Sequence, residues 1–207
     1  MTKTRLDFQF LNGIKGFMAD DEVVRLFELA EAASARGPIL EIGSYCGRSA
    51  AIMGQACKEN NSVLFSIDHH TGSEEQQPGE EYFDPDLFDD RTKGVNTLPF
   101  FRQTLSRAGL EEAVVPIVSS SAVAGRLWQT SLAMVFIDGG HSFDAAHTDF
   151  ITWSPHLIAG GYLVIHDIFF SPEAGGQAPR QVYETALATG QYEELPMTGT
   201  LGVLRQK

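Results

Sequence analysis

Hydrophobic residues in this chain occur either in short continuous runs or at helical spacing, and the two patterns alternate. The continuous runs predict strands at 39–42, 63–68, 113–118, 132–138 and 161–169. Apolar positions three or four residues apart predict helices at 20–35, 48–58, 97–110, 143–158 and 180–189, with a shorter one at 121–129. Two final strands are expected near 191–197 and 200–205, and Asp20 or Asp21 is expected to cap the first helix.

Strands that alternate with helices form parallel units, in which helices cover both faces of one sheet. The continuous apolar strands agree with this α/β class, because such strands are buried on both sides. Pro116 cannot donate a ladder hydrogen bond, so its strand is expected at an edge of the sheet. The last two strands are close enough in sequence to form a hairpin, which places one antiparallel strand in an otherwise parallel sheet.

The chain length suits one domain, and we expect residues 1–207 to form it. Residues 1–19 precede the first predicted helix as an N-terminal extension. The segments 69–95 and 169–180 show no clear period, and long loops in compact domains are usually functional or disordered. Both are candidate lids, and the first carries aromatic residues that can pack over a substrate, namely Tyr82, Phe83 and Phe88.

The net charge is −12, and Lys and Arg are scattered rather than clustered. An acidic chain repels phosphate backbones and anionic lipids, so neither nucleic acid nor a membrane is expected as a partner. No apolar stretch approaches the ~20 residues of a membrane helix. Cys46 and Cys57 have neither metal-ligand spacing nor the pattern of a disulfide framework, which favours a cytoplasmic location.

Acidic residues or histidines follow four of the predicted strands. These strand ends are Glu41 to Gly43, Asp68-His69, Asp138 to His141 and His166-Asp167. Ligands of such sheets bind at the carboxyl ends of the strands, so the four ends together predict a site. The alternative is four unrelated caps and turns.

The turn GSYCGRS after the first strand lacks both the dinucleotide fingerprint and the phosphate-loop motif. Glu41 would repel a pyrophosphate and favour a cationic ligand. S-adenosylmethionine has a sulfonium and an ammonium group and no phosphate. Asp68 ends the second strand, where a carboxylate can bind ribose hydroxyls, and Ser119 to Ser121 can reach an adenine edge. Glu41 could instead be a satisfied strand-end acid, and the serines a helix cap.

The stretches GFMADDEVVRLFELA, ILEIGSYCGRSA, VLFSIDHHTGS and VFIDGGHSFDAAHTDFITWSPHLIAGGYLVIHDIF resemble the class I S-adenosylmethionine-dependent methyltransferases. The closest resemblance is to the bacterial group of macrocin-type O-methyltransferases and cephalosporin-hydroxylase-like proteins, and it covers most of the chain from about residue 13. It implies a Rossmann-like three-layer sandwich whose seven-stranded sheet has the order 3-2-1-4-5-7-6, with strand 7 antiparallel. A homodimer is common among such enzymes, but the sequence does not decide it.

The resemblance also implies roles for individual residues. It places the methionine part of the cofactor at the glycine turn, the ribose at Asp68, with His69 in the same pocket, and the adenine at the serines. The implied cofactor-binding residues are Glu41, Gly43, Ser44, Tyr45, Gly47, Asp68, His69, Ser120, Ser121 and Asp138.

The resembling group binds a divalent metal through an aspartate after the fourth strand and an acidic pair after the fifth. Asp138 and Asp167 match these positions and could hold Mg²⁺ or another divalent metal, whereas His166 replaces one acid. His141 matches the general base of the group. The alternatives are a helix-start residue for His141 and a hydrogen-bonded strand-end acid for Asp167.

The sequence therefore predicts an S-adenosylmethionine-dependent methyltransferase that O-methylates a small hydroxylated molecule, with possible assistance from a divalent metal. A hydroxylase-like enzyme on the same fold and a non-catalytic cofactor-binding protein are the alternatives. The residues do not identify the acceptor, although the acids of segment 69–95 disfavour an anionic one.

Overall fold

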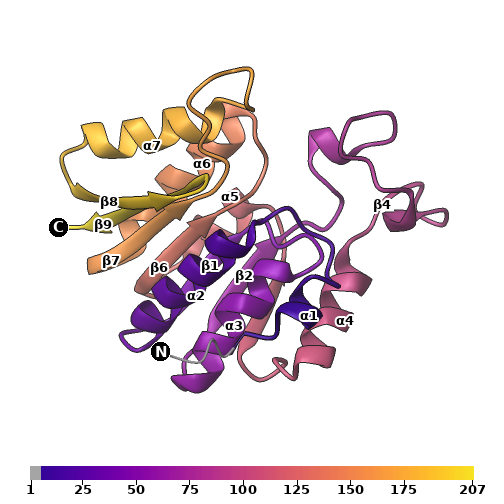
Figure 1. Ribbon diagram of the computed structural model, residues 1–207, viewed down its shortest axis with the longest axis horizontal. Coiled ribbons are helices and arrows are strands. Elements are labelled where there is room, and N and C mark those ends of the chain that lie inside the picture. The colour runs from indigo at the N-terminus through magenta and orange to yellow at the C-terminus, as the bar shows by residue number, and fades with distance from the viewer. Residues whose placement is uncertain (1–5) are drawn as a thin grey trace.

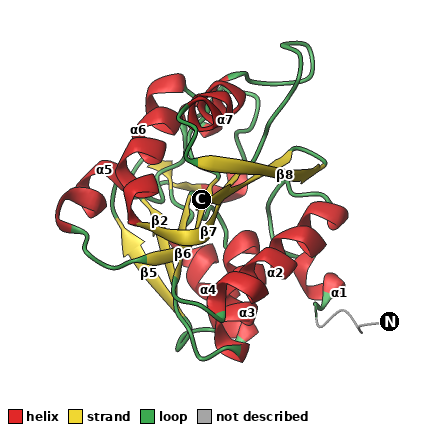
Figure 2. Cartoon of the chain, turned by 90° about the vertical axis from the view of Figure 1, so that its left-hand side faces the viewer, coloured by secondary structure: helices red, strands yellow, loops and turns green. Residues whose placement is uncertain are grey.

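The computed structural model describes residues 6–207, and they form one mixed sheet between two layers of helices (Figures 1 and 2). The strand order of the seven-stranded sheet is β5-β2-β1-β6-β7-β9-β8. Its strands are β1 (Ile39–Ile42), β2 (Leu64–Asp68), β5 (Val114–Val118), β6 (Leu132–Ile137), β7 (Leu157–Ile165), β8 (Tyr192–Thr198) and β9 (Leu201–Gln206). This is the predicted order 3-2-1-4-5-7-6, because the separate β3 and β4 do not belong to the sheet.

Two edge features of the sheet confirm expectations from the sequence. Pro116 lies on β5, which pairs with β2 alone among the strands of residues 6–207 and so forms an edge of the sheet. At the other end, β9 is antiparallel to both β7 and β8. The remaining neighbouring strands pair in parallel, which brings their carboxyl ends to one edge.

The helices divide into two sets that bury separate cores against the two faces of the sheet. One face is covered by α2 (Asp20–Ser34), α3 (Arg48–Glu59) and α4 (Leu98–Ala108), and the other by α5 (Ser121–Ala124), α6 (Phe143–Trp153) and α7 (Ala178–Ala188) (Figure 2). Alternate residues of β1 separate the cores, since Ile39 packs in the first and Leu40 in the second. The N-terminal extension contributes the short helix α1 (Phe8–Leu11) and the buried side chains of Leu11, Ile14 and Met18.

Several predicted boundaries are wrong, and the strand expected at 161–169 is β7, which ends at Ile165. The helix expected at 143–158 ends at Trp153, because Ser154-Pro155 turns the chain and Leu157 is already extended at the start of β7. The cap of α2 is Ala19, and neither Asp20 nor Asp21 occupies that position. Glu22 instead accepts a hydrogen bond from the Ala19 N–H.

The two loop segments are held by defined contacts. Segment 69–95 protrudes from the body (Figure 1) and contains two 3₁₀ turns (Glu74–Gln76 and Pro85–Leu87) and the short pair β3 (Phe88–Asp89) and β4 (Gly94–Val95). In segment 169–180, the Gln177 amide donates to the carbonyls of Phe169 and Gly175, and α7 begins at Ala178. The roles of both segments as lids remain predictions. Within residues 6–207, no helix combines the length and the apolar character needed to cross a membrane.

Candidate active site

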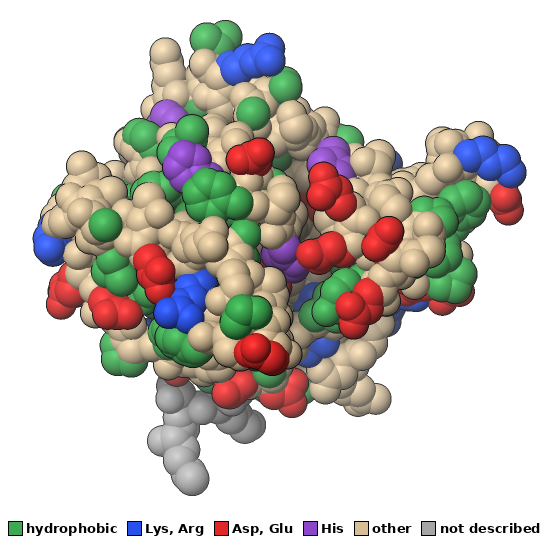
Figure 3. All heavy atoms as spheres, turned by 90° about the horizontal axis from the view of Figure 1, so that it is seen from above, with side chains coloured by type: hydrophobic (Ala, Val, Ile, Leu, Met, Phe, Trp, Pro, Cys, Tyr) green, Lys and Arg blue, Asp and Glu red, His purple; other side chains and the backbone are tan. Residues whose placement is uncertain are grey.

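The carboxyl edge of the sheet carries a cleft where acidic and histidine side chains gather, next to the protruding segment (Figure 3). The first component of this site is the glycine turn between β1 and α3. Gly43, Tyr45 and Gly47 all have left-handed backbone conformations, with φ of 85°, 47° and 90°. A Cβ on Gly43 would lie 2.1 Å from the Asp138 carbonyl oxygen, so only glycine allows this turn to approach the end of β6 so closely.

Asp68 fastens the glycine turn to the end of β2. Its Oδ2 accepts the N–H groups of Ser44 (3.0 Å) and Tyr45 (2.9 Å), and its Oδ1 accepts that of His70 (2.6 Å). An ionised carboxylate offers about four acceptor positions, so roughly one remains for a ligand hydroxyl. The expected ribose contact is therefore compatible with the structure, but it remains a prediction.

The two histidines after β2 lie in different environments. The His69 side chain is exposed and its Nδ1 lies 2.7 Å from the Thr71 hydroxyl. His70 is buried, with φ of 59°, and its Nδ1 lies 2.7 Å from the Thr97 hydroxyl. Among the described residues, His70 Nε2 and the nearby Ser44 Oγ are buried without a hydrogen-bond partner. Both residues also donate their backbone N–H groups to Asp68, so these atoms lie beside its carboxylate.

Glu41 lies beneath the turn rather than on its surface. Its fully buried carboxyl group accepts hydrogen bonds from the hydroxyls of Ser49 (2.9 Å) and Ser66 (2.6 Å). Burial raises the pKa of Glu41 to about 8, against the opposing effect of the two hydroxyls. The direct contact with a cationic ligand that the sequence suggested is therefore not available to this side chain in the structure.

The serines after β5 differ in what they offer. Ser120 is exposed and is the N-cap residue of α5. The Ser121 hydroxyl accepts a hydrogen bond from the Trp153 indole N–H (2.7 Å) and bonds to the buried Asp149, whose pKa burial raises to about 6. Ser120 is thus freer than Ser121 to meet an adenine. Asp149 escaped the sequence analysis because its place within a helix gave no signal.

The end of β6 and the end of β7 bring together a second cluster. Asp138, His141 and Asp167 can each offer one ligand atom, and these atoms lie within 4.8 Å of one another. His141 Nε2 lies 3.0 Å from Asp167 Oδ2, while His141 Nδ1 lies 2.9 Å from Oε2 of Glu75, which comes from segment 69–95. The Asp167 contact, together with that of Glu75, raises the pKa of His141 to about 9.

His166 is a buried cation behind this cluster. Its Nε2 lies 3.1 Å from Glu22 Oε2 on α2, and its Nδ1 lies 3.1 Å from Asp138 Oδ1 and 3.5 Å from Asp167 Oδ1. Burial opposes protonation, but the three carboxylates outweigh it and raise the pKa of His166 well above its usual range. Both ring nitrogens are occupied, so His166 is not placed to bind a metal. Glu22 is a further residue that the sequence analysis missed, because it lies 144 positions away from His166.

The two aspartates respond oppositely to this environment. Burial raises the pKa of Asp138, and the attraction of His166 only partly offsets it. Burial also acts on Asp167, but hydrogen bonds from His141 and His166 outweigh it and lower the pKa of that carboxyl. Asp167 is held in a left-handed conformation (φ 58°), which turns its side chain toward His141. Asp167 is therefore the ionised partner that orients the His141 ring.

The chain is similar to known proteins both in sequence and in fold. Residues 40–168 match a family described as a methyltransferase domain. The solved structure of the O-methyltransferase NovP is similar, with a TM-score of 0.67 and 14% identity over 90% of this chain and 80% of that one. An O-methyltransferase from Bacillus cereus in complex with SAH gives a TM-score of 0.67 and 14% identity over 99% and 93% of the two chains.

TomG, an O-methyltransferase from Streptomyces achromogenes solved in complex with SAM, gives a TM-score of 0.61 and 18% identity over 92% of this chain and 81% of its own. At such identities the likeness concerns the fold. The family match, in contrast, spans the glycine turn and both clusters at the edge of the sheet.

Proposed function

Since the chain belongs to the methyltransferase-domain family, we propose that it transfers the methyl group of S-adenosylmethionine to a hydroxyl oxygen of a small acceptor. The observation that carries the choice of a hydroxyl is the Asp167–His141 pair beside the glycine turn. An oxygen nucleophile must lose a proton as it attacks, and a histidine oriented by a carboxylate is the usual group to take it. The sequence Asp138-Gly-Gly-His141 also supports a place for this chain in the macrocin-type group of O-methyltransferases.

The residues of the glycine turn fit this cofactor. The remaining acceptor position of Asp68 is available to its polar groups. Ser120 would meet the adenine. The acidic side chains at this edge of the sheet attract the sulfonium and ammonium groups of the cofactor. They would repel the phosphates of a nucleotide cofactor. Glu41 supports the turn from below, through Ser49 on α3 and Ser66 on β2.

Methyl transfer is an in-line displacement in which the methyl–sulfur bond breaks as the methyl–oxygen bond forms. The sulfur leaves as a neutral thioether, and the hydroxyl proton passes to a base. We assign this base to His141 Nδ1, because Nε2 faces Asp167. Nδ1 meets Glu75 in the structure, so the acceptor hydroxyl must replace the Glu75 carboxylate there. The methyl carbon, its sulfur and the attacking oxygen must be aligned, which is the positioning task of the cleft.

The cluster of Asp138, His141 and Asp167 also fits a divalent metal. Two carboxylates and an imidazole within 4.8 Å suit a transition metal better than Mg²⁺, which prefers oxygen ligands. A metal held by Asp138 and Asp167 would polarise the acceptor hydroxyl and lower its pKa. His141 can act as the base only if it stays outside the ligand set, and with Asp138 and Asp167 as the only protein ligands Mg²⁺ would fit as well as a transition metal.

Calorimetry with S-adenosylmethionine, followed by an assay for S-adenosylhomocysteine with hydroxylated acceptors, tests this function. We expect cofactor binding and a large loss of kcat in His141→Gln, with the cofactor Kd little changed. Asp138→Asn tests the metal, since only a metal-dependent enzyme would lose its stimulation by added divalent ions. Absence of cofactor binding would refute the proposal, and binding without turnover of any acceptor would indicate a binding protein instead.

A further inference from the structure

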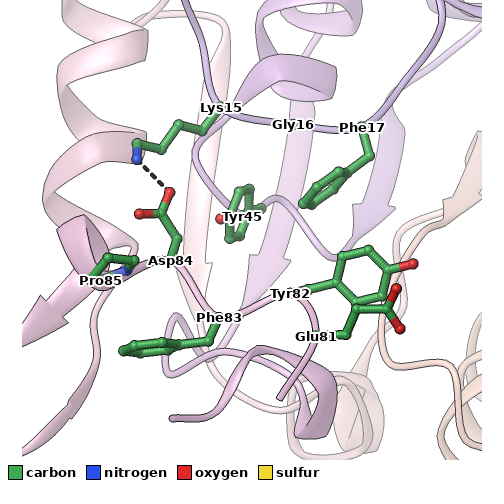
Figure 4. Close-up of a pocket in the computed structure, with 9 residues that line it drawn as sticks. All are labelled: Lys15, Gly16, Phe17, Tyr45, Glu81, Tyr82, Phe83, Asp84 and Pro85. Atoms are coloured by element: carbon green, nitrogen blue, oxygen red, sulfur yellow. Dashed lines mark hydrogen bonds and ion pairs between the residues drawn. The ribbon is translucent and has the colours of Figure 1, made fainter. Parts of the chain in front are cut away.

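A cavity of about 400 Å³ lies beside the glycine turn, between the N-terminal segment and segment 69–95 (Figure 4). Lys15, Gly16 and Phe17 form one wall, and residues 81–85 form the opposite one, with Tyr45 of the glycine turn between them. This volume falls in the range of small-molecule sites, which is roughly 300–1,000 Å³. The cavity is separate from the residues assigned to cofactor and base, apart from Tyr45.

Three aromatic rings form a continuous surface in this cavity, which we call the aromatic wall: Phe17, Tyr45 and Tyr82. The ring centroids of Phe17 and Tyr45 are 6.0 Å apart at 35°, and those of Phe17 and Tyr82 are 5.5 Å apart at 77°. Rings in direct contact leave no room for a cation between them, so this is not a cage for an ammonium group. It is a surface against which a flat ring can stack or pack edge to face.

The wall is exposed to an unusual degree for aromatic residues. Phe17 is 66% exposed and Tyr82 is 46% exposed. A large apolar surface left open beside a cleft indicates a binding site. The third expected aromatic residue, Phe88, does not line the cavity and instead packs edge to face with Phe83, at 6.2 Å between centroids.

The charges around the cavity exclude an anionic ligand. Among the described residues, Lys15 is the one cation that lines it, and Lys15 is already paired with Asp84 and Asp86. Glu81 adds a carboxylate at the rim for which no ion pair is found among the described residues. A ligand that carries a carboxylate or phosphate would meet acidic groups and no free positive charge.

The cavity is also linked to the proposed base. The Tyr82 N–H donates to the Glu75 carbonyl (3.1 Å), and the Glu75 carboxylate contacts His141 Nδ1 (2.9 Å). A ligand on the aromatic wall therefore adjoins the residue that must leave His141 before a hydroxyl can approach. Tyr45 joins the same wall to the cofactor turn through its N–H bond to Asp68 (2.9 Å).

From these contacts we infer that the aromatic wall binds a flat, uncharged aromatic ring of the acceptor, so that the enzyme methylates a phenolic hydroxyl. The inference rests on the proposed methyl transfer and names its substrate class. A sugar is less well served, because Lys15 and Asp84 in the cavity are already paired with each other and do not offer free polar atoms to its several hydroxyls. Phe17 and Tyr82 thus become determinants of acceptor specificity.

The experiment compares methyl transfer to catechol and 2,3-dihydroxynaphthalene with transfer to cyclohexane-1,2-diol, 3,4-dihydroxybenzoate and a methyl hexopyranoside. We expect the two neutral aromatic diols to be preferred. Phe17→Ala and Tyr82→Ala should each raise KM for them by about threefold to tenfold, which corresponds to the loss of one aromatic contact. Tyr82→Phe should keep the wild-type KM, and the cofactor Kd should be unchanged in every variant.

Ile151→Ala is the matched control, because it removes an exposed apolar side chain of α6, which does not line the cavity. Turnover with unchanged KM in Phe17→Ala and Tyr82→Ala would overturn the inference while leaving the methyltransferase function intact. Equal or better use of the alicyclic diol, the benzoate or the hexopyranoside would also overturn it. Loss of cofactor binding in the wild-type protein would instead refute the proposed function itself.

Discussion

Single charged groups at the carboxyl edge of the sheet determine which proton transfers are available there. His141 lies between Asp167 and Glu75, and its pKa is raised to about 9. A histidine with this pKa is mostly protonated near neutral pH and cannot accept a proton. Removing a negative neighbour destabilises the imidazolium and lowers the pKa, which makes the base available at lower pH.

Glu75→Gln should therefore move the acidic limb of the pH profile of kcat/KM to lower pH. Glu75 is partly exposed, so we expect a shift of about 0.2–0.7 pH unit, equivalent to the loss of a surface ion pair. The measurement is kcat/KM from pH 5 to 10 for both proteins. Glu74→Gln, one residue away and exposed, should leave the profile in place. An identical profile for Glu75→Gln would argue against His141 as the base.

His166 has a structural consequence at the same scale. Its imidazolium compensates Glu22, Asp138 and Asp167, so His166→Gln leaves Glu22 and Asp138 without their cation and Asp167 with His141 alone. Breaking a buried pair costs on the order of 3–5 kcal/mol of unfolding free energy. Urea unfolding at pH 6.5 measures this loss, and His156→Gln serves as the control.

The pH dependence of this loss has a definite sign. The pKa of His166 is raised on folding, so its contribution is complete below the unfolded pKa of about 6.5 and diminishes as the pH rises toward the folded value. His166→Gln should therefore cost more at pH 6 than at pH 9. A difference that grows with pH would show that His166 is neutral in the folded protein.

Among the secondary elements, the hydrophobic pattern predicted the sheet strands and longer helices, and Pro116 located one edge of the sheet. The failures came where tertiary contacts override local pattern. The chain leaves α6 at Trp153 and enters β7 at Leu157, although the apolar spacing continues through this region. The strand pattern predicted that the polar strand ends share one edge of the sheet. It did not predict that Glu41 faces inward or that α2 supplies a partner for His166, since both depend on the packing of distant elements.

The N-terminal segment and segment 69–95 are joined through Lys15, which pairs with Asp84 and Asp86. Lys15→Ala should release the protruding segment, because few buried side chains hold it otherwise. We expect amide hydrogen exchange across 74–87 to become faster while exchange in β1 and β6 is unchanged. Lys93→Ala, which removes the exposed partner of Asp90 in the same segment, is the control. Equal exchange in the wild type and Lys15→Ala would show that other contacts fix the segment.

Across the whole molecule, ligand binding and folding are linked, and this gives a test of the cofactor class that needs no acceptor. A ligand that binds only the folded chain stabilises it by about 2.7 kcal/mol at 100 times its Kd. For a domain of this size that raises the Tm by roughly 5–10 °C. The net charge of −12 and the absence of a phosphate-loop motif in the glycine turn predict this effect for S-adenosylmethionine and its absence for NAD. The one cation of that turn, Arg48, already contacts Asp20 and Asn12 and is not free to pair with a pyrophosphate.

Asp68→Asn separates this specific effect from general stabilisation. An amide NH₂ in place of one oxygen would face the backbone N–H groups of Ser44 and Tyr45 or that of His70, so the turn loses acceptors as well as a ribose ligand. The variant should have a lower Tm without ligand and a much smaller rise with S-adenosylmethionine. Ser62→Ala, which also removes a side-chain hydrogen bond but far from the carboxyl edge, should keep the full rise. If NAD raised the Tm as much as S-adenosylmethionine, the charge argument for the cofactor would fail, because the acidic edge would then tolerate a pyrophosphate.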